Sequence, residues 1–490
     1  MRKWCGLLLI AALLCSLCGC LTVDSDWKPV YSDVSEDAFP ESLPEEGSTT
    51  TTTVTTTASA TTTGDVGPTG TVTGTDTTVT EATTTAGDST TAERDDTTAD
   101  TSSTATKTST TRTTQKTTKS TTASTTTAVT PAKDEFRAAW VSYIELDALL
   151  KANNTPAKAE AAIKTLMAKL KSYNLNTVIW IARANSDAYY ASDCYKAAAT
   201  AEPLLQAGFD PLKCAVTAAH ANGLDFHVWV NPYRIGKNES YAAIDEYFYC
   251  DGKYYYVPTS QKVQKQILDG IRELVNGYDV DGVHFDDYFY PAGCATENAK
   301  ADFETGSPPT GQSWGEWRRT AVSALVRAAY AICHSRKDCV FGISPSHSLS
   351  KNRDQYFAPC DEWLAESGYV DYLCPQVYFG FENGSAPFDK TVDTWLSYPR
   401  SRDVKLYFGV GLYKAGLKSD TWAGNGKTEW LDNDDILKRE VECLRARSQV
   451  DGMAFYSYSF FEPAVKLAGD STYSMDVAKK GVENLLSVLR

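Results

Sequence analysis

Short apolar runs alternate with amphipathic segments over residues 134–490. The runs are rich in β-branched and aromatic residues, which favour β-strands, and the segments between them have the apolar spacing of α-helices. Strands are expected at Phe136–Ile144, Thr177–Arg183, Leu224–Pro232, Val280–Asp286, Cys339–Ser344, Val370–Tyr378, Val404–Leu412 and Gly452–Tyr458. Helices are expected at Pro156–Tyr173, Pro211–Asn222, Ser260–Gly277, Trp314–Ser335, Val392–Tyr398 and Asp434–Arg447.

This alternation predicts an α/β fold. A strand that is followed by a helix and then by another strand forms a unit whose strands pair in parallel. Eight strands in one region of this length favour a single (β/α)8 TIM-type barrel over 134–490 rather than an open sheet. No glycine-rich phosphate-binding motif follows the first expected strand, which counts against a dinucleotide-binding domain.

The first residues have the pattern of an export signal. Arg2 and Lys3 precede an apolar run that is too short to span a bilayer stably. The sequence Leu17-Cys18-Gly19-Cys20 resembles the lipobox of bacterial lipoproteins, in which the signal is removed before the cysteine and the thiol is lipidated. The resemblance implies a signal peptide at 1–19 and a lipid anchor on Cys20, which would hold the protein at the extracellular face of the bacterial membrane without spanning it.

Residues 20–131 have the composition of a linker. An acidic segment is followed by a long stretch dominated by Thr and Ser, with too few large apolar side chains to form a core. The composition predicts a disordered stalk of the kind that is often O-glycosylated, and a bare flexible spacer is the alternative.

Net charge and cysteine content limit the possible ligands and cross-links. The net charge of −15 and the lack of Lys/Arg clusters argue against binding to nucleic acid. Of thirteen cysteines, four lie in the leader through Cys20, which leaves nine in the folded region. An odd number in an exported protein implies at least one free thiol or an intermolecular bridge. The spacing of His and Cys predicts no zinc site, no cofactor is expected, and the protein is expected to be a monomer.

The strongest chemical signal lies at Asp281–Pro291. Val283 and Phe285 continue a buried strand, and Asp286 and Asp287 follow directly. Because an unpaired buried charge costs several kcal/mol, the two carboxyls are expected at the C-terminal end of the strand, where barrels carry their active sites. The alternative is an acidic turn that caps the next helix.

Other expected strand ends add polar and aromatic side chains that suit a sugar. Arginine, amide and tyrosine groups bind hydroxyl or carboxylate groups, and tryptophan offers an apolar platform for a sugar ring. For Trp229, the alternative to sugar binding is a packing role in the barrel core. The candidate substrate-binding residues are Arg183, Trp229, Asn231, Tyr233, Arg234, Tyr288, Tyr290, Arg318, Gln376, Tyr378 and Tyr456. A partner for Arg183 is expected in Asp286 or in a substrate carboxylate, and Arg318 is expected to reach the acidic pair.

Nine motifs come in the order of a known family. They include Asn176-Thr-Val-Ile-Trp-Ile-Ala-Arg183, His227-Val-Trp-Val-Asn-Pro-Tyr-Arg234, Asp281–Pro291, Phe341-Gly-Ile-Ser-Pro345 and Pro375-Gln-Val-Tyr378. The region resembles the glycosyl hydrolase-like 10 family of bacterial envelope proteins over nearly all of 134–460. It departs from the usual pattern in two places: Arg137 is followed by Ala rather than Gly, and His347 comes soon after Ser344-Pro345, where an aromatic residue and Gly are more usual. The resemblance implies a (β/α)8 barrel that hydrolyses glycosides, with relatives linked to the glycan strands of peptidoglycan.

These observations lead to three hypotheses. The favoured one is a glycoside hydrolase of cell-wall glycan or a related polysaccharide, with Asp286 as nucleophile or general base and Asp287 as a less certain partner. The second carboxyl is expected on another loop, at Glu145, Glu316, Glu362 or Glu382, unless an N-acetyl sugar supplies its own nucleophile. The second hypothesis is a barrel that binds glycan without cleaving it. The third is a metal-dependent hydrolase or deacetylase that uses His227, His284 and Asp286.

Overall fold

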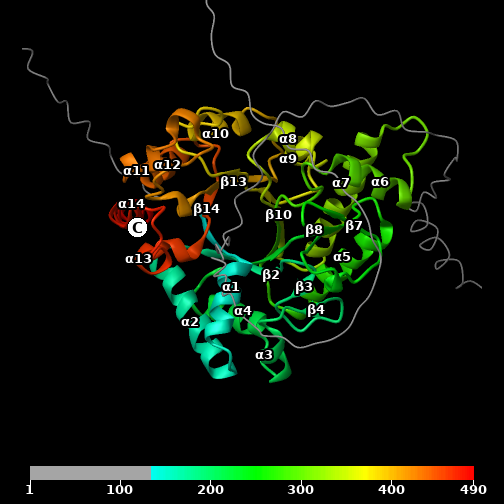
Figure 1. Ribbon diagram of the computed structural model, residues 1–490, viewed down its shortest axis with the longest axis horizontal. Helices are drawn as coiled ribbons and strands as arrows, with labels where there is room; N and C mark the ends of the chain where they lie inside the picture. Colours follow the sequence, from blue (N-terminus) through cyan, green and yellow to red (C-terminus); the bar gives the residue numbers. More distant parts are fainter. Residues whose placement is uncertain (1–133) are drawn as a thin grey trace, which may run out of the picture. The chain divides into compact units, whose positions relative to one another are not determined.

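The computed structural model describes residues 134–490, which form a closed ring of eight parallel strands surrounded by helices (Figure 1). Around the ring the order is β1, β2, β5, β9, β10, β11 with β12, β13 and β14, which pairs with β1. The bounds are β1 Phe136–Val141, β2 Thr177–Arg183, β5 Asp225–Val230, β9 Gly282–Phe285, β10 Val340–Ile343, β11 Tyr372–Leu373, β12 Gln376–Val377, β13 Lys405–Val410 and β14 Gly452–Phe455. The predicted (β/α)8 barrel is therefore confirmed, while the predicted signal peptide, Cys20 and the stalk lie outside the described residues.

Helices cover the outside of the ring. Their bounds are α1 Tyr143–Ala152, α2 Pro156–Ser172, α3 Glu202–Gln206, α4 Pro211–Ala221, α5 Gln261–Gly277, α6 Ala295–Thr305, α7 Trp314–Cys333, α8 Leu349–Asp354, α9 Cys360–Ala365, α10 Phe388–Leu396, α11 Glu429–Asp432, α12 Ile436–Arg445, α13 Pro463–Lys466 and α14 Met475–Leu489. The six predicted helices correspond to α2, α4, α5, α7, α10 and α12. Within residues 134–490, no helix combines the length and the apolar character needed to cross a bilayer.

The first strand ends earlier than predicted. Ile144 was expected in this strand, but β1 ends at Val141 and α1 begins at Tyr143. The Ser142 hydroxyl and backbone N–H both donate to the Glu145 carboxylate, each at 2.9 Å, and form a capping box with it. This local hydrogen bonding starts the helix although Ile144 favours strands.

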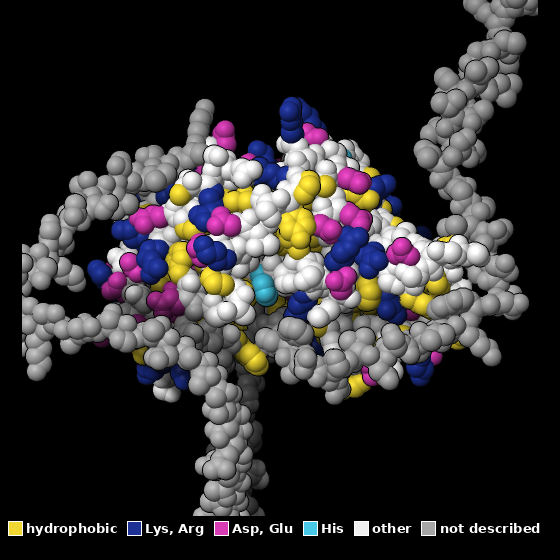
Figure 2. All heavy atoms as spheres, turned by 90° about the horizontal axis from the view of Figure 1, so that it is seen from above, with side chains coloured by type: hydrophobic (Ala, Val, Ile, Leu, Met, Phe, Trp, Pro, Cys, Tyr) yellow, Lys and Arg dark blue, Asp and Glu magenta, His cyan; other side chains and the backbone are white. Residues whose placement is uncertain are grey.

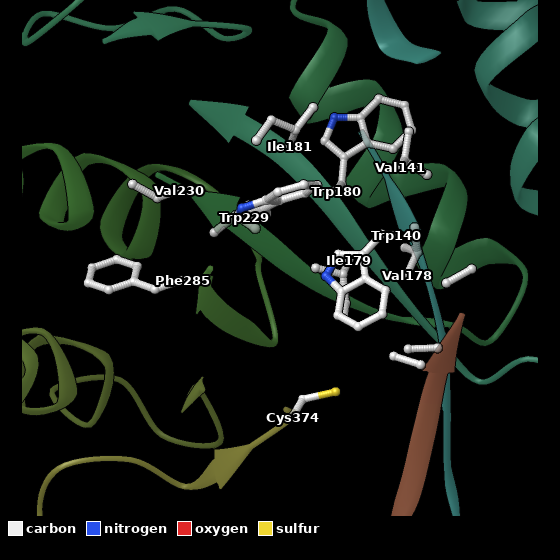
Figure 3. Packing of buried hydrophobic residues seen from close by; sticks show 14 of the residues in the cluster. Trp140, Val141, Val178, Ile179, Trp180, Ile181, Trp229, Val230, Phe285 and Cys374 are labelled. Atoms are coloured by element: carbon white, nitrogen blue, oxygen red, sulfur yellow. The ribbon is translucent and has the colours of Figure 1, made fainter. Parts of the chain in front are cut away.

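The interior of the barrel is filled by side chains from alternate strand positions. Trp140, Trp229 and Cys374 point into the ring, whereas Val141, Trp180 and Phe285 point toward the helices (Figure 3). Deeper inside, the rings of Phe136 and Tyr407 stack with their centroids 4.0 Å apart. The centre is therefore a packed core rather than a channel.

One insertion was not predicted. The chain between β5 and α5 forms a small antiparallel sheet of β6 (Arg234–Gly236), β7 (Tyr247–Cys250) and β8 (Lys253–Tyr256). A disulfide joins Cys250, at the end of β7, to Cys294, directly before α6. We name this part the hairpin insert. A second pair of short strands, β3 (Asp187–Ala188) and β4 (Lys196–Ala197), follows β2.

The visible surface carries charges of both signs. On the face seen in Figure 2, lysine and arginine side chains alternate with aspartate and glutamate, and hydrophobic side chains form small separate groups. Such a mixed surface lacks the single-sign field that attracts nucleic acid over the area in view.

Candidate active site

The acidic pair lies where β9 leaves the barrel. Asp286 follows the buried strand directly and is itself only 3% exposed. Its Oδ1 accepts a hydrogen bond from the backbone N–H of Tyr288 at 3.2 Å, whereas Oδ2 is buried without a hydrogen-bond partner. The carboxyl thus sits at the C-terminal end of the barrel strands, as predicted, and one of its oxygens is left for another group.

Burial controls the charge of Asp286. Removal from water raises the pKa of this carboxyl well above its usual range, and the neighbouring Asp287 adds to the rise. The guanidinium of Arg234 and the indole of Trp229 oppose it only in part. The Trp229 Nε1 is also buried, and neither it nor Asp286 Oδ2 has a partner at hydrogen-bonding geometry. Burial and the adjacent carboxyl therefore both favour the protonated form of Asp286.

Asp287 has different surroundings. Burial raises its pKa to about 6, while Lys351 of α8 and the Gln376 amide stabilise its charged form. Its backbone carbonyl accepts a hydrogen bond from Phe289 at 2.9 Å. The two carboxyls thus differ, because their surroundings favour the protonated form more strongly at Asp286 than at Asp287. Such a difference can divide acid and base roles between two carboxyls.

Several predicted residues gather around Asp286. Trp229 pairs in register with His284, one layer below the carboxyl. The Arg234 guanidinium lies 5.1 Å from the centre of the Tyr288 ring and 5.5 Å from that of Tyr143. The structure therefore brings Trp229, Arg234 and Tyr288 together beside Asp286.

A second group of predicted residues lies across the mouth. The Gln376 amide donates to the Ser344 carbonyl at 3.0 Å. The Tyr378 and Tyr456 rings stack with centroids 5.7 Å apart, and Tyr413 meets both rings edge-on. The three tyrosines follow β12, β13 and β14 and form an aromatic wall at the same end of the barrel as Asp286.

Three other predicted residues are held by the protein itself. Arg183 donates to the Pro232 carbonyl at 2.8 Å and lies 4.5 Å above the Tyr195 ring, so its expected contact with Asp286 is absent in the described region. The Asn231 amide donates to the Ala184 carbonyl at 3.0 Å. Tyr233 is fully buried against Phe289.

Arg318 and Tyr290 belong to a separate contact. Arg318 Nε donates to Asp302 Oδ2 at 2.6 Å, and the Tyr290 hydroxyl donates to Oδ1 at 2.9 Å. Arg318 was expected to reach the acidic pair and Tyr290 to face the sugar. Both instead bind a wholly buried carboxylate of α6, because the chain turns after Asp287 and directs Tyr290 toward that helix.

Three of the four candidate glutamates have other partners. Glu145 accepts hydrogen bonds from Ser142, Ser457 and Ser459, and both of its oxygens are used. Glu316 caps the N-terminus of α7 through Ser313, and Glu362 pairs with Arg353 at 2.8 Å. Glu382 is exposed on the connection that follows β12. Asp287 is therefore the carboxyl adjacent to Asp286 in the chain, and Glu382 stays a prediction for the second carboxyl.

The two inward histidines are bound to core side chains. The Trp140 indole donates to His284 Nε2 at 3.2 Å, so Nδ1 of the neutral ring carries the proton and donates to the Tyr372 hydroxyl at 2.9 Å. That hydroxyl in turn donates to His227 Nδ1 at 2.9 Å. Burial lowers the pKa of His227 to about 4 and that of His284 well below its usual range.

The same hydrogen bonds weigh against the metal hypothesis. His284 uses both of its ring nitrogens, and His227 uses Nδ1. In residues 134–490, no three His, Cys, Asp or Glu side chains are grouped in a way that could hold a metal ion.

Two residues near the pair were missed. Lys351 lies on α8, a short helix that was not predicted. Tyr143 was assigned to the first strand, although the spacing of Ser142 and Glu145 already indicated a helix start there. Only the fold brings Lys351 near Asp287.

Fold and site together define a class: a (β/α)8 barrel with a buried pair of carboxyls at the C-terminal end of its strands. Within this class, the chain belongs to the glycosyl hydrolase-like 10 family, whose model matches residues 135–423. This confirms the family that the motifs indicated.

Curated relatives and a solved structure are similar to this chain. The glycosyl hydrolase YngK of Bacillus subtilis (strain 168) is 28% identical over 355 residues, which cover 66% of this chain and 68% of that protein. The glycosyl hydrolase DigH of Escherichia coli (strain K12) is 27% identical over 291 residues, which cover 51% of this chain and 64% of that protein. The glycoside hydrolase domain of PgaB (BpsB) from Bordetella bronchiseptica is 14% identical, with a TM-score of 0.49, and the match covers 72% of this chain and 99% of that domain.

Proposed function

We propose that the protein is a glycoside hydrolase that cleaves bacterial cell-wall glycan or a related polysaccharide. The observation that carries this proposal is the Asp286 carboxyl, which is buried at the C-terminal end of the barrel strands and has no hydrogen-bond partner at Oδ2. Its burial also favours the protonated form by raising its pKa. A carboxylic acid in this state is a proton donor for a glycosidic oxygen.

The two carboxyls divide the chemistry. Asp286 donates its proton to the leaving oxygen and then takes a proton back from water as general base. The ionised Asp287 keeps that proton on Asp286 and stabilises the positive charge that develops on the sugar ring. The sequence predicted Asp286 as nucleophile or general base. We keep the general-base role for the second step, place proton donation before it, and assign no nucleophilic attack to Asp286.

The surrounding side chains suit a sugar. Trp229 and Tyr288 border Asp286, and Tyr378 with Tyr456 forms the facing aromatic wall. Arg234 and Gln376 add donors for hydroxyl or carboxylate groups. We assign these six residues to substrate binding, whereas the contacts of Arg183, Asn231, Tyr233, Tyr290 and Arg318 give those residues a supporting role.

The substrate test uses the full chain and purified peptidoglycan glycan strands, with and without stem peptides. New reducing ends and shorter fragments are expected with the wild-type protein. Binding without any new reducing end in either preparation would favour the non-catalytic glycan-binding barrel. Loss of cleavage on addition of a chelator would favour the metal-dependent alternative.

The pH dependence of kcat/KM should be bell-shaped. Asp287 must be ionised, so kcat/KM should fall about tenfold per pH unit below a pKa of about 6. Asp286 must hold its proton, so kcat/KM should also fall at high pH. In Asp287→Asn the negative charge that raises the pKa of Asp286 is gone, and the alkaline limb should move to lower pH. Initial rates from pH 4 to 10 measure both limbs, and a flat profile would contradict the assignment.

We also propose that the protein is anchored at the extracellular face of the membrane through Cys20, with residues 48–130 as a stalk. This proposal rests on the lipobox resemblance and the Thr-rich composition. Wild-type protein should sediment with membranes and need detergent for release. Cys20→Ser should no longer incorporate radiolabelled fatty acid, and unchanged incorporation would refute lipidation at Cys20.

A further inference from the structure

Large exposed aromatic side chains are concentrated at one end of the barrel. Trp422 is 61% exposed, Phe303 58% and Tyr249 56%. They lie between the end of a strand (β13, β9 or β5) and the long helix that follows it (α12, α7 or α5), which places them at the same end as Asp286. Tyr398, by contrast, lies before β13 and therefore at the opposite end.

Trp422 is displayed by a fixed segment. Its near neighbours Asp420 and Ala423 are 4% and 2% exposed. Asp420 forms a buried ion pair with Lys414 at 2.5 Å, and the Ala423 carbonyl accepts a hydrogen bond from Gly384 at 3.0 Å. Because the backbone on both sides is fixed, a ligand that stacks on the indole orders little additional chain.

Tyr249 is fixed in a similar way on the hairpin insert. Its ring lies 4.9 Å from the Tyr254 ring of the paired strand. The next residue, Cys250, is bonded to Cys294. The exposed ring is therefore held on a cross-linked sheet rather than on a loose loop.

The two rings stand on opposite walls. From β5 to β13 there are four steps in either direction around the ring of strands. Figure 1 shows the β7–β8 hairpin on one side of the barrel and α11, which follows Trp422, on the other. The mouth of an eight-stranded barrel is about 15 Å wide between backbones, so a ligand that touches both walls must be an extended chain.

We propose that Trp422 and Tyr249 are outer sugar-binding platforms on opposite walls of the mouth, and that they hold a polysaccharide whose chain passes Asp286 between them. This inference rests on the proposed function and specifies its substrate as a long chain bound on both sides of the cleavage point. The exposed face of Trp422 and that of Tyr249, which packs beside Tyr254, each suit the apolar face of a single pyranose ring. A protein partner would need a larger continuous area.

The test compares a polymer with a short substrate. Full-chain Trp422→Ala, Tyr249→Ala and the double variant are assayed on peptidoglycan glycan strands freed of stem peptides and on the shortest fragment that the wild type cleaves. The ratio of kcat/KM on the polymer to that on the fragment should fall about tenfold in each single variant and further in the double variant. Trp422→Phe should restore most of the ratio. Tyr398→Ala, the matched control at the opposite end, should leave it at the wild-type value.

A binding arm separates the two proposals. Binding of each variant is measured by affinity electrophoresis, as the slower migration of the protein through a gel that contains immobilised glycan strands. Thermal melting checks that each variant is folded. If the wild type cleaves the strands but the ratio is unchanged in the double variant, the platforms are refuted and the hydrolase stands. If the wild type binds without cleaving and the double variant loses retention, the hydrolase is refuted and the platforms stand. A wild type that neither cleaves nor binds refutes both.

Discussion

Asp286→Asn should lower kcat/KM on the glycan about 10³-fold while glycan binding persists. The amide keeps the size of the side chain but has no acidic proton to give to the leaving oxygen, and general acid catalysis contributes on this scale. Reducing-end assays measure the rate, and retention on immobilised glycan measures binding.

The same variant has a predicted stability signature. The pKa of Asp286 is raised in the folded protein, so at pH 8 the unfolded chain ionises this group more readily and is favoured. Below the unfolded pKa both states hold the proton and the penalty disappears. Asp286→Asn should therefore raise Tm at pH 8 and leave it nearly unchanged at pH 4.

A matched aspartate provides the control. Asp338 precedes β10 at the opposite end of the barrel, is highly exposed, and has a φ of 66°, a conformation that asparagine tolerates. Asp338→Asn should keep wild-type activity and the wild-type dependence of Tm on pH. Full activity in Asp286→Asn would end the case for this carboxyl as the proton donor.

Gly342→Ala should lower the free energy of unfolding by about 3 kcal/mol. A Cβ at this position would lie 2.0 Å from Cζ of Tyr372. That ring packs against Phe136 and Tyr407, and its hydroxyl bonds both His227 and His284, so it has no free direction in which to move. Denaturant titration followed by fluorescence measures the loss.

Two further variants check the cause. Gly277→Ala, at the end of α5, meets nothing within 4 Å and should be neutral or slightly stabilising. Tyr372→Leu in the Gly342→Ala background removes the clash and should recover part of the loss. Equal stability of Gly342→Ala and Gly277→Ala would show that the barrel interior is less tightly packed than described.

Local sequence was sufficient for the barrel and for its acidic end. The strands appear as apolar runs because both of their faces are buried, and Asp286 marks the end of β9 because a charge is costly within such a strand. Period-two alternation also placed His284 below Asp286. These features depend only on neighbouring residues, so no knowledge of the distant chain was needed.

Partners that are distant in the sequence could not be predicted in this way. Tyr372 binds two histidines that lie 88 and 145 residues away, and no local pattern links them. The prediction paired Arg318 with the wrong carboxylates. Its partner Asp302 lies on α6, which has weak apolar periodicity and was not predicted. The roles of two candidate glutamates, by contrast, could have been predicted from the sequence. Ser142 with Glu145 and Ser313 with Glu316 both have the spacing of a capping box, which indicates helix starts rather than catalytic carboxyls.

The bond between Cys250 and Cys294 joins the connection after β5 to the connection after β9. Neither cysteine belongs to the ring of strands. We therefore expect the reduced protein to keep its barrel, while the hairpin insert becomes more mobile relative to the connection after β9. Protein produced in a reducing cytosol should therefore have nearly the same Tm, but should bind long polysaccharide chains more weakly. A compartment that oxidises thiols would be needed to form this bond and complete the fold of the protein.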